Sequence, residues 1–195
     1  MSGKIILIGG GNFEKGETLT IDQKILAFTK KKEPTILMIP AAMKDDQGYG
    51  KRFKQYFRKL QANPSVLRLW HTKLSKEEVY QMFLQADIIY LGAGSTLLLK
   101  EAIEKWELAP ILQQAYQKGS IIVGISAGAN ILCSYGYSDI QENEYQMIQG
   151  IGLLPFVFTP HAQKRPHFLE EASKHSLKSL ALNDKEFYIY PKENH

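Results

Sequence analysis

Short apolar runs rich in β-branched residues recur along this chain, and between them lie segments whose apolar positions repeat with helical spacing. The runs are continuous rather than alternating, which is typical of strands buried on both faces. We predict strands at residues 4–8, 35–39, 66–70, 87–91, 120–123, 156–159 and 187–190. We predict helices at residues 17–31, 50–60, 75–86, 96–105, 110–118 and 166–182. This alternation predicts an α/β fold with a mostly parallel sheet and helices on both faces.

The carboxyl ends of the predicted strands are where chemistry is expected, because ligands of such sheets bind beyond those ends. Gly9-Gly10-Gly11 follows the first strand, but position 14 is Glu14, so the Gly-x-Gly-x-x-Gly spacing of a dinucleotide site is missing. The phosphate-cradling pattern Gly-x-x-x-x-Gly-Lys-Ser/Thr is also missing. We therefore expect no cofactor.

Composition limits the class of protein. A chain of 195 residues with 44% hydrophobic and 23% charged residues is typical of one globular domain, here residues 1–195. No apolar run approaches the roughly 20 residues of a membrane-spanning helix, and the first residues lack a signal-peptide pattern. The single cysteine, Cys133, cannot form an intrachain disulfide or, alone, a zinc site. We expect a cytoplasmic protein without metal, with Cys133 buried in a helix.

Charge gives little indication of a macromolecular partner. The net charge is only +4, and the lysines are spread along the chain apart from Lys30-Lys31-Lys32. Arginines clustered among aromatic residues, as in nucleic-acid interfaces, do not occur. We expect neither a nucleic-acid nor a membrane partner, and a chain that acts as a monomer or homodimer.

The run at residues 120–123 leads into Gly124-Ile125-Ser126-Ala127-Gly128, a Gly-x-Ser-x-Gly pattern followed by helix-compatible residues. This pattern predicts a strand, a sharp turn and a helix, with the Ser126 hydroxyl presented at the carboxyl end of the sheet. A nucleophilic serine is presented in this way. A simple strand-to-helix connection can have the same pattern, so the other segments of the chain are needed to distinguish a nucleophile from a structural turn.

A serine nucleophile needs a base within hydrogen-bond reach, and the base needs a carboxylate that fixes its tautomer. His161 follows the strand predicted at 156–159 and is the best-placed base, and Asp139 lies on a predicted turn. Residues 92–96, Gly-Ala-Gly-Ser-Thr, follow the fourth predicted strand. Amides exposed there could form an oxyanion hole, or the loop could simply cap the next helix.

Taken together, these segments resemble the peptidase E and cyanophycinase family of serine peptidases, which includes α-aspartyl dipeptidases. The family is related in fold to class I glutamine amidotransferases, so the resemblance implies a three-layer α/β fold. It rests on residues 92–96, 124–129, 135–139 and 154–161. Ala93 and Ser95 depart from the family, which usually has glycine and asparagine at these positions.

The resemblance also implies roles for individual residues. Ser126 is the implied nucleophile, His161 the base, and the amides of Gly94 and Ala127 the oxyanion hole. Asp139 is the favoured third member of the triad.

A rival acid in related enzymes lies after the histidine, near the last strand, where this chain has Asp184. We therefore predict a cofactor-independent serine peptidase that acts on small peptides, aspartyl dipeptides first. Two alternatives remain at this point: an esterase or amidase that uses the same serine, and a non-catalytic binding or regulatory protein.

Overall fold

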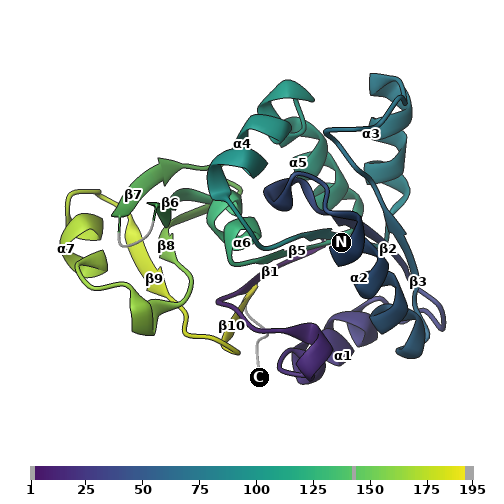
Figure 1. Cartoon of the computed structure of the whole chain (residues 1–195), viewed down its shortest axis with the longest axis horizontal. Helices are drawn as coiled ribbons and strands as arrows, with labels where there is room; N and C mark the ends of the chain where they lie inside the picture. Colours follow the sequence, from purple (N-terminus) through teal and green to yellow (C-terminus); the bar gives the residue numbers. More distant parts are fainter. Residues whose placement is uncertain (1–2, 142–143, 192–195) are drawn as a thin grey trace.

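The computed structural model describes residues 3–141 and 144–191, and these form two β-sheets (Figure 1). Six strands form the main sheet in the order β10-β1-β5-β4-β2-β3. They are β1 (Lys4–Ile8), β2 (Thr35–Ile39), β3 (Asn63–Val66), β4 (Ile88–Leu91), β5 (Ile121–Ile125) and β10 (Phe187–Tyr190). Neighbouring strands are parallel, except that β10 runs antiparallel to β1.

Helices cover both faces of the main sheet, because successive strand residues point to opposite faces and both sets are apolar. Ile6 and Ile8 of β1 pack in a core with α1 and α2, whereas Ile5 and Leu7 belong to the core under α3, α4, α5 and α6. The helices are α1 (Leu19–Phe28), α2 (Gln47–Lys59), α3 (Lys76–Gln85), α4 (Thr96–Lys105), α5 (Ala109–Lys118), α6 (Ala127–Leu132) and α7 (Phe168–Ser173). Short 3-10 turns occur at η1 (Phe13–Lys15), η2 (Ala41–Met43) and η3 (Ala162–Lys164). The predicted α/β fold, with a mostly parallel sheet between helices, is confirmed.

A second, four-stranded sheet lies beside the main one in the order β7-β6-β8-β9 (Figure 1). It consists of β6 (Cys133–Gln141), β7 (Glu144–Gln149), β8 (Leu154–Thr159) and β9 (Lys178–Ala181). Only β8 was predicted among these strands. Cys133, expected in a helix, starts β6 because α6 ends at Leu132, although the cysteine is fully buried as expected.

Two further predictions, the strand at 66–70 and the long helix at 166–182, are wrong over most of their length. The strand predicted at 66–70 overlaps the observed strand, β3, only at Val66. Leu67 and Leu69 lie after the strand, and their side chains are nevertheless buried in the core. The helix predicted at 166–182 ends at Ser173, and β9 pairs instead with the edge of β8. In both cases a contact distant in sequence decides the local structure.

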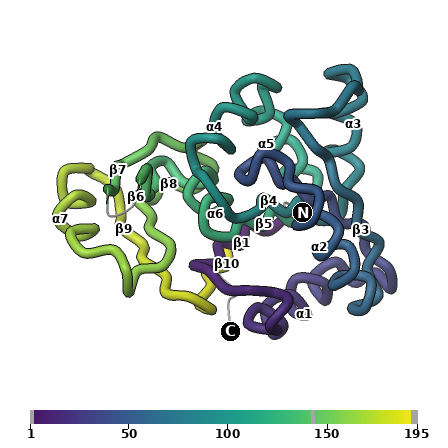
Figure 2. Tube along the Cα trace, viewed as in Figure 1, coloured from purple at the N-terminus to yellow at the C-terminus, as the bar shows by residue number. Residues whose placement is uncertain are grey.

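The last strand, β10, pairs with the first strand, β1, so the segment before β10 crosses from the second sheet to the main one. Figure 2 shows the yellow end of the chain beside the purple start, where β10 pairs with β1. Phe187 lies opposite Ile8, so residues 182–186 cross at the carboxyl end of β1. Within residues 3–141 and 144–191, no helix has the length and apolar character needed to cross a membrane.

Candidate active site

Ser126 lies at the turn between β5 and α6, as the Gly-x-Ser-x-Gly pattern predicts. Its backbone has φ 52° and ψ −109°, a conformation that costs about 1–3 kcal/mol for a residue other than glycine. The surrounding structure holds this turn, since the Ser126 amide donates to Ile8 O at 3.0 Å and the Ser126 carbonyl accepts from the Asn130 amide at 3.0 Å.

The two glycines of the pattern allow close packing below the serine. A Cβ on Gly124 would lie 2.3 Å from the carbonyl oxygen of Gly128, and a Cβ on Gly128 would lie 2.2 Å from that of Leu91. Distances this short are not tolerated between backbone atoms. The glycines therefore let α6 begin directly against β4 and β5, which fixes where Ser126 points.

His161 follows β8 and reaches Ser126 from the second sheet. Its Nε2 atom lies 2.9 Å from Ser126 Oγ, which is hydrogen-bond distance for a nucleophile and its base. Its amide donates to Gly9 O at 3.0 Å, so the loop after β1 holds the histidine backbone. The side chain is 26% exposed, which leaves the ring accessible from one side.

Asp184 completes this arrangement. Its Oδ1 atom is hydrogen-bonded to His161 Nδ1, and Gln163 Nε2 donates to its Oδ2 at 2.5 Å. Gln163 Oε1 in turn accepts from the Asp184 amide at 3.3 Å. Gln163 thus holds both the carboxylate and the backbone of Asp184, and the carboxylate faces the imidazole, as in the geometry of a Ser-His-acid triad.

Asp139, the acid that the sequence favoured, lies elsewhere. Its carboxylate forms an ion pair with Arg165 at 2.7 Å, and its side chain is 59% exposed on β6. Arg165 also lies over the ring of Tyr145, 4.7 Å from the centroid. The structure thus brings Asp184, the alternative acid, to His161 in the loop between β9 and β10, whereas Asp139 on β6 contacts Arg165.

The proposed oxyanion donors lie at two neighbouring helix starts. Ala127 is the first residue of α6, and the first amides of a helix have no acceptor within it. Gly94 precedes α4 with φ 132°, and a Cβ there would lie 2.4 Å from Ala42 O, so only glycine fits this turn. The next amide, that of Ser95, is already used by Ala42 O at 2.8 Å.

Ser95 and Ala93, which depart from the family pattern, each make a defined contact in the structure. Ser95 caps α4, with its Oγ accepting from the Leu98 amide at 3.3 Å. Ala93 is half-buried and packs against the core that contains Tyr49. Burial raises the pKa of Tyr49 to about 12, so its phenol stays neutral beside this loop at ordinary pH.

The glycine loop after β1 has a function that the sequence analysis did not find. A Cβ on Gly10 would lie 2.1 Å from Asp184 Oδ1 and 2.3 Å from His161 Cε1. The loop therefore makes room for the histidine and its acid. The signal is the run of three consecutive glycines after a predicted strand, which is equally typical of a ligand loop and of a tight chain reversal.

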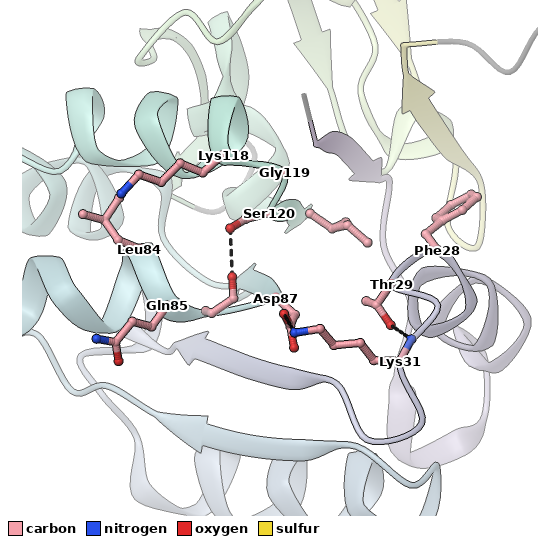
Figure 3. Close-up of a pocket in the computed structure, with 11 residues that line it drawn as sticks. Phe28, Thr29, Lys31, Leu84, Gln85, Asp87, Lys118, Gly119 and Ser120 are labelled. Carbon is pink, nitrogen blue, oxygen red and sulfur yellow. Dashed lines mark hydrogen bonds and ion pairs between the residues drawn. The ribbon is translucent and has the colours of Figure 1, made fainter. Parts of the chain in front are cut away.

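A separate cavity lies at the opposite, amino end of the parallel strands (Figure 3). It has a volume of about 280 Å³, and Lys31, Asp87 and Ser120 are among the residues that line it. Lys31 forms an ion pair with Asp87 at 2.6 Å, and Ser120 Oγ donates to Ala86 O at 2.8 Å. These contacts tie loops to the sheet, and no member of the Ser126 arrangement lines this cavity.

Comparisons with known proteins show which family the sequence matches. A sequence model of peptidase family S51 matches residues 5–195. The chain is 34% identical over 159 residues to "Uncharacterized peptidase YgaJ" of Bacillus subtilis (strain 168), covering 81% of this chain and 68% of that protein. It is 28% identical over 137 residues to "Probable alpha-aspartyl dipeptidase" of Drosophila melanogaster, covering 69% and 55%, so the chain spans only about half of that relative.

Solved structures share the fold at low sequence identity. A peptidase from an acI-B1 Actinobacterium superposes with a TM-score of 0.74 at 18% identity, covering 97% of this chain and 83% of that one. A protein from Listeria monocytogenes EGD-e gives a TM-score of 0.73 at 15% identity, covering 98% and 96%. At these identities the likeness shows the fold alone.

Proposed function

The chain belongs to peptidase family S51, and from this premise we propose that it is a serine peptidase that hydrolyses small peptides, with aspartyl dipeptides the first substrates to test. The family assignment confirms the resemblance found in the sequence. The observation that supports a serine mechanism most directly is the 2.9 Å distance between Ser126 Oγ and His161 Nε2, with Asp184 on the other ring nitrogen.

The proposed reaction follows from these contacts. Ser126 Oγ attacks the carbonyl carbon of the peptide bond while His161 Nε2 takes the hydroxyl proton. Asp184 accepts a hydrogen bond from Nδ1–H, keeps the other nitrogen free as a base, and stabilises the imidazolium that forms. His161 then gives its proton to the leaving amine, and a water molecule activated by the same nitrogen releases the acyl group from Ser126.

The tetrahedral intermediate carries a negative oxygen, which we propose is stabilised by the amides of Gly94 and Ala127. The Ala127 amide is suited to this, because the first amides of a helix are unpaired within it and the helix dipole is positive there. The Gly94 amide lies one residue before the N-cap of α4. Removing one such donor in other acyl-transfer enzymes costs about 10²- to 10³-fold in rate.

Names of relatives support the choice of substrate. The Drosophila relative is named "Probable alpha-aspartyl dipeptidase", and a Nostoc sp. relative, 21% identical over 97% of this chain and 78% of its own, is named "Peptidase E". We carry the aspartyl dipeptide substrate to this chain as part of the proposal.

The first experiment compares the wild type with Ser126→Ala on a panel of aspartyl dipeptides, other dipeptides and small esters. We expect Ser126→Ala to lower kcat by about 10⁴-fold or more. Ser120→Ala is the matched control, because Ser120 is a buried serine at the other end of the sheet. A folded Ser126→Ala variant with undiminished activity would contradict the mechanism.

Labelling with a fluorophosphonate tests the serine without a substrate. Mass spectrometry should find one adduct on Ser126, and prior reaction should block peptide hydrolysis. Faster cleavage of esters than of any peptide would favour an esterase instead. An unlabelled protein that cleaves neither class would favour a non-catalytic member of the family.

A further inference from the structure

Three buried polar side chains form a hydrogen-bonded cluster behind the proposed oxyanion hole. The Thr96 and Ser138 hydroxyls are 2.9 Å apart, and Asn130 Nδ2 donates to Thr96 Oγ1 at 3.2 Å. Thr96 and Asn130 are 1% exposed and Ser138 is 3% exposed. Burying such groups costs free energy unless they are paired, so the hydrogen bonds within the cluster offset part of that cost.

The cluster joins the two helix starts that carry the proposed donors. Thr96 is the first residue of α4, two positions after Gly94. Asn130 lies in the first turns of α6, and its own amide donates to Ser126 O at 3.0 Å. The Thr96 hydroxyl therefore connects the Gly94 loop, through a single side-chain contact, to the helix that begins at Ala127. Figure 1 shows α4 and α6 next to each other.

Packing leaves Asn130 little freedom to move. A Cβ on Gly136 of β6 would lie 2.7 Å from Asn130 Oδ1, so the strand backbone closes over this side chain. Within the described part of the chain, Asn130 Oδ1 has no hydrogen-bond partner, so the contact through Nδ2 to Thr96 is the polar contact that orients the amide.

The Gly94 loop is thus held from two directions. In front, the Ser95 amide donates to Ala42 O at 2.8 Å, and behind, Thr96 Oγ1 accepts from Asn130. The first contact ties the loop to the turn after β2, and the second ties it to the nucleophile helix. Of these two contacts, the second joins the segment that follows Gly94 to the helix that begins at Ala127.

We propose that Thr96 is a positioning residue that sets the separation of the two oxyanion donors, with Asn130 and Ser138 as its partners. This inference rests on the proposed function, because it concerns the same reaction. A hydroxyl is required at position 96, since it accepts from Asn130 and shares a hydrogen bond with Ser138. Valine has the same shape but can do neither.

The test is Thr96→Val, with steady-state kinetics on the best dipeptide found for the wild type. Loss of a whole oxyanion donor costs about 10²- to 10³-fold, so displacing one should lower kcat by about 10- to 100-fold while KM stays within about twofold. Thr96→Ser keeps the hydroxyl and should restore most of the lost kcat.

A peptide aldehyde supplies the measurement that separates positioning from general damage. It adds to Ser126 as a tetrahedral hemiacetal, whose oxygen occupies the oxyanion hole. In Thr96→Val its affinity should fall by the same factor as kcat/KM, whereas the affinity for a cleavage product should not change.

Thr35→Val is the matched control. Thr35 Oγ1 also makes two hydrogen bonds, both with Asp87 at 3.0 Å, at the amino end of β2. The same substitution there should lower stability without changing kcat or aldehyde affinity. If Thr96→Val does not fold, Ser138→Ala removes only one of the two contacts and should show the same pattern at a few-fold magnitude.

If the wild type is active and Thr96→Val has the same kcat and aldehyde affinity as Thr35→Val, the inference about Thr96 is overturned, whereas the proposed function stands. Equal losses of aldehyde and product affinity also overturn it, since they indicate a distorted site rather than a displaced donor. A wild type that neither cleaves peptides nor reacts with a fluorophosphonate removes the proposed function, and the inference with it.

Discussion

The side chain whose replacement tests the proposed triad most sharply is Asp184. In Asp184→Asn, the hydrogen bond with Gln163 determines how the new side-chain amide is oriented. Gln163 Nε2 donates to Asp184 Oδ2, and Gln163 Oε1 is occupied by the Asp184 amide, so Gln163 cannot simply turn around. The oxygen of the new amide is therefore expected to face Gln163 and its NH₂ group to face His161 Nδ1.

This orientation has two costs. An NH₂ group facing Nδ1 favours the tautomer with the proton on Nε2, and that nitrogen then cannot take the proton of Ser126. The carboxylate is also lost beside the imidazolium that forms in the reaction. Two unit charges about 4 Å apart interact by about 4 kcal/mol at an effective dielectric constant of 20.

Solvent reduces the electrostatic part, because the side chains of His161 and Asp184 are 26% and 30% exposed. About 2–3 kcal/mol remains after this screening, which corresponds to about 30- to 150-fold in rate. With the tautomer effect added, we expect Asp184→Asn to lower kcat by about 10³-fold, within a range of about 10² to 10⁴.

The assay is kcat and KM for dipeptide hydrolysis near neutral pH, with circular dichroism to verify folding. Asp139→Asn is the matched control, because the Asp139 side chain is 59% exposed and an asparagine oxygen can still accept the hydrogen bond from Arg165. It should keep activity within about threefold of the wild type. A large loss in Asp139→Asn together with a nearly active Asp184→Asn would refute the assignment of the acid.

Three further predictions follow from packing and burial. Gly10→Ala should lower kcat by about 10²-fold or more without unfolding the protein, as kinetics and circular dichroism would show, because the added methyl would occupy the place of Asp184 Oδ1 and His161 Cε1. Burial raises the pKa of Asp22 from 3.8 to about 6, so at pH values between these two its carboxyl binds more protons in the native than in the unfolded state, and its contribution to the free energy of unfolding should fall by about 3 kcal/mol as pH rises through this window. Urea unfolding of the wild type and of Asp22→Asn at several pH values should show this fall as a change in the difference between the two proteins. Cys133 is fully buried and burial raises its pKa, so iodoacetamide should leave both the thiol and the activity intact until the protein is unfolded, whereas inactivation of the folded protein would indicate a reactive thiol.

Much of the main sheet could be predicted from the sequence, because its strands are continuous apolar runs. The segments at 4–8, 35–39 and 187–190 were predicted with the bounds that they have. β1 and β2 are recognisable locally, since burial on both faces demands apolar residues. β10 is a partly exposed edge strand, and its aromatic and β-branched residues are typical of strands. The serine turn was predictable for a similar reason, because its glycines are required by backbone contacts within a few residues.

The second sheet was not predictable in the same way. β6, β7 and β9 mix polar, aromatic and small residues, and their pairing depends on segments distant in sequence. The contact between His161 and Asp184, instead of the favoured Asp139, was not predictable for the same reason. The residues next to each aspartate in the sequence do not indicate that Asp184 contacts His161 or that Asp139 pairs with Arg165.

The crossing of residues 182–186 between the two sheets has a consequence for when the site becomes complete during synthesis. The chain emerges amino end first, so Ser126 and His161 are made before the segment that carries Asp184, which lies 23 residues after the histidine. That segment reaches its place only when β9 has joined β8 and β10 has joined β1. Under the proposed mechanism, a nascent chain therefore holds Ser126 and His161 without Asp184, and we expect hydrolytic activity only once β9 and β10 have paired with β8 and β1.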